Sequence, residues 1–241
     1  MVFVIELDIR IAMHKILITG ASSGIGLRLT RDFLINGDAV VASYYTNDRP
    51  LKYLAKKYSG LKTVKWSLEQ EEQLKYPDDS LDILVLCAGA IRSQLMLKES
   101  SDNFSDCLQQ NLIANFRIIK KLCPLLLQSS NAHIIVLSSL SSLLGDTGQV
   151  SYSTSKASLN GLSKALAQEL AGKGIKVNTI FPGFMKSKQT ISKYNKLMEK
   201  YKRDNVLKKI NTLSEISAFI QHLTTTRNIS GQVFNLDSRI Y

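Results

Sequence analysis

The stretch that decides the fold is residues 15–26, KILITGASSGIG, where a short apolar run passes directly into a glycine-rich turn. The glycines at 20, 24 and 26 leave the backbone open, so that free N–H groups at the start of a helix can approach a phosphate. Taken alone, such a turn also fits a plain strand-to-helix connection. Its position after the first strand of an alternating strand and helix pattern favours a dinucleotide site instead.

That alternation of β-branched runs and helical stretches continues along the chain. The predicted strands are 15–19, 39–43, 63–66, 83–87, 133–138, 176–180 and 232–235. The predicted helices lie near 24–36, 51–58, 105–128, 151–171 and 214–224. This order predicts an α/β fold, a single doubly wound Rossmann domain whose seven-stranded, mainly parallel sheet carries helices on both faces.

Composition excludes several classes of protein. The 241 residues contain no apolar run long enough to cross a bilayer, so we expect no membrane partner. Three cysteines without metal-ligand spacing predict neither a disulfide framework nor a metal site, and favour a reducing, cytoplasmic location. Residues 1–12 are apolar but interrupted by Glu6 and Asp8, which is unlike a signal peptide. Met13 is a candidate natural start, so we expect a dispensable extension at 1–12 and one catalytic domain at 13–241.

The end of the second predicted strand bears on the choice of dinucleotide. NAD-binding turns usually place a carboxylate about 20 residues after the glycines, and no acidic residue stands near Tyr44. The hydroxyls of Ser23, Ser43 and Thr46, with Arg49 close by, could accommodate a 2′-phosphate. We therefore favour NADP(H), while Asp48 a few residues on keeps NAD(H) open.

Tyr152 and Lys156 stand four residues apart at the start of a predicted helix, so both project from one face. Tyr53 and Lys57 repeat that spacing on what reads as a solvated helix, so the spacing alone proves little. Ser139, however, directly follows an apolar strand, at the sheet edge where ligands bind. A nearby ammonium would lower the phenol pKa from about 10, so that Tyr152 could protonate a carbonyl oxygen that Ser139 orients.

With these motifs in place, residues 13–237 resemble the short-chain dehydrogenase/reductase family of the Tyr-x-x-x-Lys type, especially its 3-oxoacyl carrier-protein reductase-like members. The matching positions are Thr19-Gly20-x-x-x-Gly24-x-Gly26, Cys87-Ala88-Gly89, Asn111, Ser139, Tyr152-x-x-x-Lys156 and Pro182-Gly183. The resemblance implies that Ser139, Tyr152, Lys156 and Asn111 are catalytic. It implies that Asn111 holds a water and a helix kink in a proton relay and that Lys156 also binds the nicotinamide ribose. It implies that the cofactor contacts Thr19, Gly20, Ser22, Ser23, Gly24, Ile25, Gly26, Ser43, Tyr44, Ser67, Leu68, Ala88, Gly89, Pro182, Gly183 and Ser187.

The chain also departs from the family pattern. Leu86-Cys87 replaces a usual Asn-Asn pair, Ser67-Leu68 a usual Asp-Val, and Ser187 a usual Thr. The segment between the third and fourth strands has room for only about two turns of helix. These changes put the adenine hydrogen bond and the support beneath the cofactor in doubt, but leave Ser139, Tyr152 and Lys156 intact.

The net charge of +11 is concentrated in one segment. Residues 186–209 carry nine basic and two acidic side chains, +7 of the total, within the region 184–210 that the resemblance implies is a substrate lid. A basic lid suits an acidic substrate such as an acyl-carrier thioester, a nucleotide sugar or another phosphorylated ketone, although a solvated lysine-rich helix explains it as well. We expect no nucleic-acid partner.

The sequence thus predicts an NADP(H)-dependent enzyme that reduces a ketone or aldehyde to an alcohol, or runs the reverse reaction. The family resemblance implies a homodimer or homotetramer, assembled through the helices near 105–128 and 151–171. Two alternatives stay open: an NAD-linked alcohol dehydrogenase of the same family, and a non-catalytic protein that senses a dinucleotide.

Overall fold

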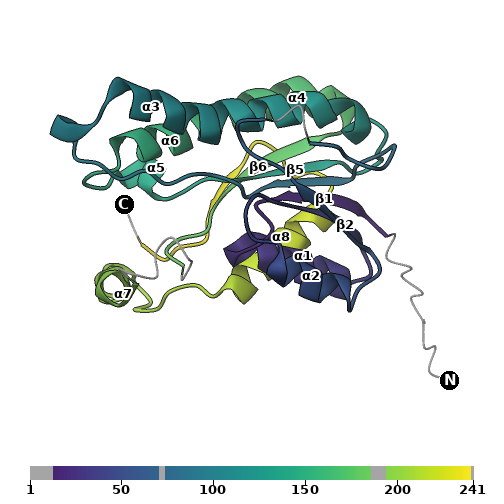
Figure 1. Ribbon diagram of the computed structural model, residues 1–241, viewed down its shortest axis with the longest axis horizontal. Coiled ribbons are helices and arrows are strands. Elements are labelled where there is room, and N and C mark those ends of the chain that lie inside the picture. The colour runs from purple at the N-terminus through teal and green to yellow at the C-terminus, as the bar shows by residue number, and fades with distance from the viewer. Residues whose placement is uncertain (1–12, 71–73, 186–193, 240–241) are drawn as a thin grey trace.

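The computed structural model describes residues 13–70, 74–185 and 194–239 and contains one parallel sheet (Figure 1). Seven strands pair in the order β3-β2-β1-β4-β5-β6-β7, and every pair is parallel. The strands are β1 Lys15–Thr19, β2 Ala39–Tyr44, β3 Leu61–Lys65, β4 Ile83–Leu86, β5 His133–Leu137, β6 Lys176–Phe181 and β7 Val233–Asn235. The predicted doubly wound α/β fold is confirmed, and each predicted strand lies within about two residues of its place.

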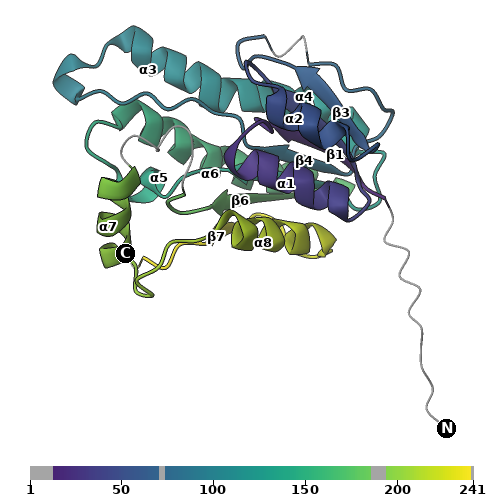
Figure 2. The ribbon, with the colours of Figure 1, turned by 60° about the horizontal axis from the view of Figure 1, so that its bottom comes forward.

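Helices cover both faces of this sheet, with α3, α4 and α6 on one side and α1, α2 and α8 on the other (Figures 1 and 2). The α-helices are α1 Gly24–Ile35, α2 Arg49–Ala55, α3 Ser101–Leu108, α4 Ala114–Leu126, α5 Ser141–Leu144, α6 Val150–Leu170, α7 Tyr194–Asp204 and α8 Leu213–Thr225. The helix predicted over 105–128 is divided between α3 and α4 by a π-helical turn, Gln109–Ile113. Between β3 and β4 the described residues, 66–70 and 74–82, form no helix.

Successive side chains of β1 point to opposite faces of the sheet, which explains why helices cover both faces. Ile16 and Ile18 point into a core shared with α1, α2 and α8, whereas Leu17 points into a second core shared with α4 and α6. All three side chains are fully buried, as expected for a central parallel strand. The capping box predicted at the start of α8 is present, with Glu215 N donating to Thr212 Oγ1 at 3.2 Å.

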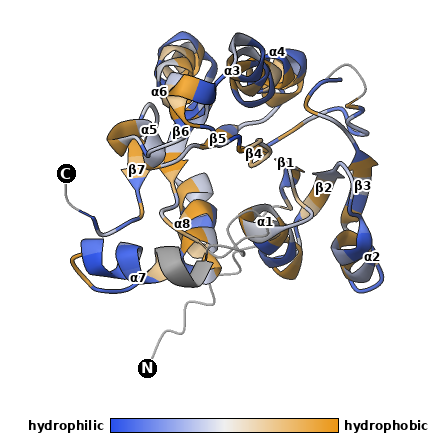
Figure 3. Cartoon of the chain, turned by 60° about the vertical axis from the view of Figure 1, so that its left-hand side comes forward, coloured by the Kyte–Doolittle hydropathy of each residue, from blue (hydrophilic) through white to orange (hydrophobic). Residues whose placement is uncertain are grey.

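The surface helix α7 differs from these packed helices. Its sequence YNKLMEKYKRD is predominantly polar, and Figure 3 shows it mostly in blue, whereas α8 carries an orange face toward the sheet. Within the part of the chain that the structure describes, no helix combines the length and the apolar character needed to cross a membrane.

One buried histidine makes the fold sensitive to acid. His133 begins β5 and is fully buried, and burial together with the nearby Lys176 cation lowers its pKa to about 4. An unfolded chain binds a proton at this histidine below a pH of about 6.5, whereas the folded chain does not until about pH 4. The free energy of unfolding should therefore fall by about 3 kcal/mol as the pH drops through this window. His14 works in the opposite direction, because its hydrogen bond to Asp38 raises its pKa and stabilises the fold in acid.

Urea unfolding between pH 7.5 and 4.5 checks this prediction. His133→Leu should flatten the loss of stability in acid, whereas His222→Leu on the exposed side of α8 should leave it unchanged. An equal pH dependence in the His133→Leu protein and in the unsubstituted one would show that this buried imidazole contributes nothing to it.

Candidate active site

A cleft of about 810 Å³ opens at the carboxyl ends of β1, β4, β5 and β6. β1 pairs with β2 on one side and β4 on the other, so the cleft lies where the strand order reverses, the usual ligand position in such sheets. Most of the residues predicted from the sequence line it, namely Gly20, Ser22, Ser23, Gly24, Ile25, Gly26, Ser43, Tyr44, Ser67, Leu68, Ala88, Gly89, Ser139, Tyr152, Lys156, Pro182 and Gly183. Among the other predicted site residues, Thr19 and Asn111 lie behind its wall, and Ser187 lies outside the described residues.

The glycine-rich turn is packed so closely that larger side chains would displace it. Gly20 has a φ of +63°, and a Cβ there would lie 2.9 Å from the backbone of Ala88. A Cβ on Gly26 would lie 2.5 Å from the carbonyl oxygen of Gly20, whereas Gly24 faces open space. The turn therefore presents bare backbone to the cleft at the N-terminus of α1, a geometry that suits a pyrophosphate.

Thr19 holds this turn against the neighbouring strand. Its fully buried hydroxyl accepts hydrogen bonds from the backbone N–H groups of Cys87 and Ala88, both at 3.1 Å. On the other side Gly20 N donates to Ser43 Oγ at 3.2 Å. Thr19 is thus a positioning residue that joins the ends of β1 and β4, rather than a lining residue.

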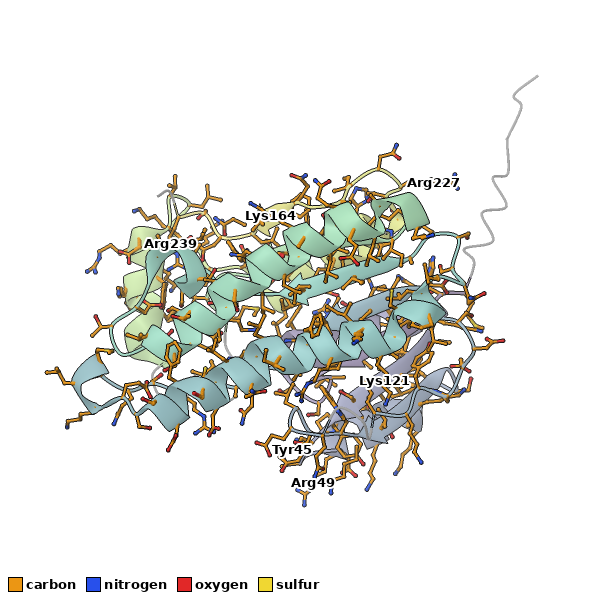
Figure 4. The ribbon with its side chains drawn as sticks, turned by 90° about the horizontal axis from the view of Figure 1, so that it is seen from above. Tyr45, Arg49, Lys121, Lys164, Arg227 and Arg239 are labelled. Atoms are coloured by element: carbon orange, nitrogen blue, oxygen red, sulfur yellow. The ribbon has the colours of Figure 1, made fainter. Side chains whose placement is uncertain are left out.

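The end of β2 bears on the choice of dinucleotide. Tyr44, Tyr45 and Thr46 line the cleft there, together with the serine at 43. Asp48 does not line it, because its carboxylate pairs with Lys52 at 2.8 Å along α2. Arg49 does not line the cleft itself, but Figure 4 shows it near Tyr45, which does.

One acidic residue, Glu69, lines this end of the cleft from the loop that follows β3. Glu69 lines the cleft next to Ser67 and Leu68, and its Oε1 accepts a hydrogen bond from Gln110 Nε2 at 3.0 Å. Its carboxylate belongs to the loop after β3 rather than to the end of β2, where an acidic residue would select NAD.

Tyr152 and Lys156 stand in the first two turns of α6, and Ser139 is the second residue after the end of β5. The Tyr152 hydroxyl and Ser139 form a hydrogen bond. Lys156 is 5% exposed, and its Nζ donates to the carbonyl oxygen of Leu137 at 2.9 Å. A Cβ on Gly89 would come within 3.3 Å of that Nζ, so the β4 loop lies directly over the ammonium group.

The expected effect of Lys156 on Tyr152 is wrong for this structure. Burial raises the pKa of Tyr152 to about 12, and only its hydrogen bond with Ser139 acts in the opposite direction. The ammonium of Lys156 is committed to Leu137, and burial lowers its own pKa to about 8. The removal of the phenol from water raises its pKa by more than the Lys156 cation could lower it. Tyr152 therefore keeps its proton at neutral pH.

Asn111 sits in the π-helical turn and clamps the loop that follows β4. Its amide accepts from Ala90 N at 2.8 Å and donates to Ala90 O and Ser155 Oγ, both at 2.9 Å. Its backbone oxygen accepts from Asn115 Nδ2 at 2.6 Å, a side-chain bond to a carbonyl one turn back. Asn111 thereby joins the β4 loop to α6, next to the Gly89 and Lys156 contact.

Three lining residues at the catalytic end have no signal in the sequence. Asp146 lies in the loop before α6, Tyr201 on α7, and Arg239 in the segment after β7. None belongs to a motif, and only the folded chain brings them together. Phe184 and Met185 also line this end, while residues 186–193 of the predicted lid lie outside the described residues.

Comparison with known proteins points to one family. The profile described as short chain dehydrogenase matches residues 14–197. A 3-oxoacyl-(acyl-carrier-protein) reductase of Rickettsia prowazekii is 36% identical over 198 residues, 80% of each chain. A Pseudomonas aeruginosa RhlG structure with NADP is 26% identical, covers 95% of this chain and 96% of its own, and gives a TM-score of 0.86.

A second solved structure carries the other dinucleotide. It is a 4-hydroxyisoleucine dehydrogenase mutant complexed with NADH and succinate, 28% identical, with a TM-score of 0.84 over 93% of this chain and 97% of its own. With the glycine turn, the Tyr-x-x-x-Lys pair and the parallel sheet on one scaffold, this chain belongs to the short-chain dehydrogenase/reductase family of oxidoreductases.

Proposed function

We propose that this protein is an NADP(H)-dependent carbonyl reductase that converts a ketone or aldehyde to an alcohol. One observation carries the proposal: Ser139, Tyr152 and Lys156 line the same cleft as the glycine-rich turn, and the half-buried phenol of Tyr152, with its pKa raised, holds its proton. A group that keeps its proton until a carbonyl oxygen needs it is suited to the reductive direction.

The residues of the cleft fit a dinucleotide. The exposed backbone at Ser22, Ser23 and Gly24 and the N-terminus of α1 would hold the pyrophosphate, and the Ala88–Gly89 backbone would support the nicotinamide half. Lys156 would bind the nicotinamide ribose through its ammonium. When bound, the cofactor supplies the hydride that the carbonyl carbon accepts.

The residues of this chain supply the proton and the orientation. Tyr152 donates its phenolic proton to the carbonyl oxygen, and the Ser139 hydroxyl holds that oxygen by a hydrogen bond. The phenolate that forms is stabilised by the Lys156 cation one helical turn away. Asn111 acts as a positioning residue, because it fixes the loop that carries Gly89 beside Lys156.

The proposed substrate is acidic, as the basic segment 186–209 suggests. The Rickettsia relative is named for reducing a 3-oxoacyl group on an acyl carrier protein, and such a thioester is one candidate here. A nucleotide sugar or another phosphorylated ketone would suit the same charge.

The domain, the lid and the assembly predicted from the sequence are part of the same proposal. We propose that residues 13–241 form one catalytic domain with 184–210 as its lid, and that copies assemble through α4 and α6 into a homodimer or homotetramer. Light scattering tests the assembly, and a monomer would contradict it. The cytoplasmic location and the lack of a nucleic-acid partner stay predictions.

The cofactor preference follows from the end of β2. With no carboxylate from β2 against the cleft and with Ser43, Tyr45 and Thr46 lining it, we expect kcat/KM to be about tenfold or more higher with NADPH than with NADH. The NADP-bound Pseudomonas structure supports this choice, whereas the NADH complex of the dehydrogenase mutant shows that related proteins also use the other cofactor.

Asp48→Asn provides the matched control for this preference. Because Asp48 pairs with Lys52 outside the cleft, the substitution should leave the NADPH to NADH ratio unchanged. A strong preference for NADH that disappears in Asp48→Asn would mean that Asp48 binds the ribose and that the enzyme is an NAD-linked dehydrogenase.

A further inference from the structure

A guanidinium projects into the catalytic end of the cleft from the segment that follows β7. Arg239 lines the cleft with Tyr152 and Ser139, and its side chain is only 12% exposed. Figure 4 shows it far across the molecule from Tyr45 and Arg49. Arg239 therefore belongs to the substrate end of the cleft rather than to the adenosine end.

Two neighbours fix the plane of this guanidinium. Asp237, 2% exposed, accepts from Arg239 Nε at 2.8 Å and from Nη2 at 2.7 Å. The guanidinium carbon lies 4.5 Å from the centre of the Tyr201 ring, which in turn stacks on Phe184 at 4.4 Å and 20°. A guanidinium held on one edge and stacked on one face has little rotational freedom left to lose on binding.

The bonds to Asp237 leave three of the five N–H groups, and the Tyr201 hydroxyl is a further hydrogen-bond partner of this guanidinium. A guanidinium has five N–H donors, and Asp237 takes one from Nε and one from Nη2. The end formed by Nη1 and the second hydrogen of Nη2 matches the two oxygens of a carboxylate. We propose that Arg239 is a specificity-determining residue that binds a carboxylate group of the substrate through this edge, an inference that rests on the proposed reductase function.

Asp146 is the opposing charge in this part of the cleft. It lies within electrostatic range of Tyr152, Tyr201 and Arg239, and its carboxylate accepts the Ser141 hydroxyl at 2.7 Å. A substrate carboxylate on Arg239 would come into the field of Asp146 as well. Removal of the Asp146 charge should therefore strengthen the binding of an anionic substrate, opposite in sign to removal of Arg239.

The fold does not depend on Arg239 to place the segment after β7. Asn205, buried at the end of α7, accepts hydrogen bonds from Ser238 N at 3.0 Å and Ser238 Oγ at 2.8 Å. Val206 N also donates to Ser238 O at 3.1 Å. These bonds anchor the segment independently of the guanidinium. Arg239→Gln leaves the buried Asp237 carboxylate without its cation, so circular dichroism and thermal unfolding must first show that the variant is folded before its kinetics are compared.

Matched probes test the proposal. Acetoacetate and its ethyl ester present the same ketone with and without a carboxylate, and NADPH oxidation gives kcat/KM for each. Arg239→Gln should lower kcat/KM for acetoacetate by about 10- to 100-fold and change the ester by less than about threefold. Asp146→Asn should raise the value for acetoacetate, and Arg239→Lys should fall between the glutamine variant and the unsubstituted enzyme because it keeps the charge without the fork.

A binding measurement separates this proposal from the proposed reaction. Calorimetric titration of the NADP⁺-loaded enzyme with succinate should give a dissociation constant that Arg239→Gln weakens by about 10- to 100-fold. If neither ketone is reduced but this shift is seen, the reductase proposal is at fault and the carboxylate site stands. Equal succinate binding by both proteins, failure of succinate to bind the unsubstituted enzyme, or equal losses for acetoacetate and ester would overturn the role of Arg239.

Discussion

Replacing Tyr152 by phenylalanine is expected to lower kcat for carbonyl reduction by about 1,000-fold or more while NADPH binding is retained. The substitution removes a single oxygen, the atom that donates the proton, and leaves the ring packed at the start of α6. Hydride arrival at the carbon would then create an alkoxide with no acid at hand to protonate it. Stopped-flow turnover and fluorescence titration with NADPH measure the two effects separately.

The chain supplies its own control for this substitution. Tyr53 stands on α2, four residues before Lys57, which lies just beyond the end of that helix. The spacing is that of the catalytic pair, but Tyr53 is 72% exposed on the surface. Tyr53→Phe should leave kcat unchanged. Near-normal turnover by Tyr152→Phe would remove this residue from the proton transfer, and equal losses in both variants would point to a general effect on the fold.

Replacing Gly26 by alanine is expected to weaken NADPH binding by about 100-fold or more, equivalent to about 3 kcal/mol. The new Cβ would lie 2.5 Å from the Gly20 oxygen and 3.1 Å from the Ala21 Cα, so the turn must move away from α1. Backbone N–H groups that surround a phosphate would no longer converge on it. Overpacking of this kind also costs about 1–3 kcal/mol of stability, which chemical unfolding would register.

Gly172→Ala is the matched control, in the 3₁₀ turn Ala171–Lys173 beyond the end of α6. Position 172 is exposed, and an added Cβ would meet no atom within 4 Å outside its own turn. This variant should bind NADPH normally and gain about 0.5–1 kcal/mol of stability from the better helix former. NADPH affinity that is unchanged in Gly26→Ala would contradict the assignment of this turn as the phosphate site.

The fold was predictable because local pattern and global architecture agree in this chain. Each strand is a short β-branched run, and the glycines at 20, 24 and 26 directly follow the first of them. Parallel strands bring their carboxyl ends to one edge, so residues after β1, β4, β5 and β6 meet in one cleft although they are far apart in sequence. Motif spacing was enough to place Ser139, Tyr152 and Lys156 there.

The parts that sequence reasoning missed depend on tertiary contacts. The π-helical turn at Asn111 has no periodicity signal, and only the family resemblance implied a kink there; the turn lies where the amide clamps Ala90 and Ser155. The direction of the Tyr152 pKa could not be read from the Tyr-x-x-x-Lys spacing, because burial outweighs the charge four residues away. Arg239 belongs to the site only because the segment after β7 turns back beside α7.

The fate of a labelled hydride directly tests whether this protein transfers hydride from NADPH to a carbonyl carbon. The enzyme is incubated with NADPH that carries deuterium at the transferable C4 position. The candidate substrates are acyl-carrier thioesters, keto sugars, their nucleotide derivatives and keto acids. Mass spectrometry then measures the deuterium content of each alcohol product. We expect one deuterium on the carbinol carbon of one class of product, at a rate that Tyr152→Phe reduces by about 1,000-fold. Tight NADPH binding with no deuterium in any alcohol would contradict it and identify a protein that only senses the dinucleotide.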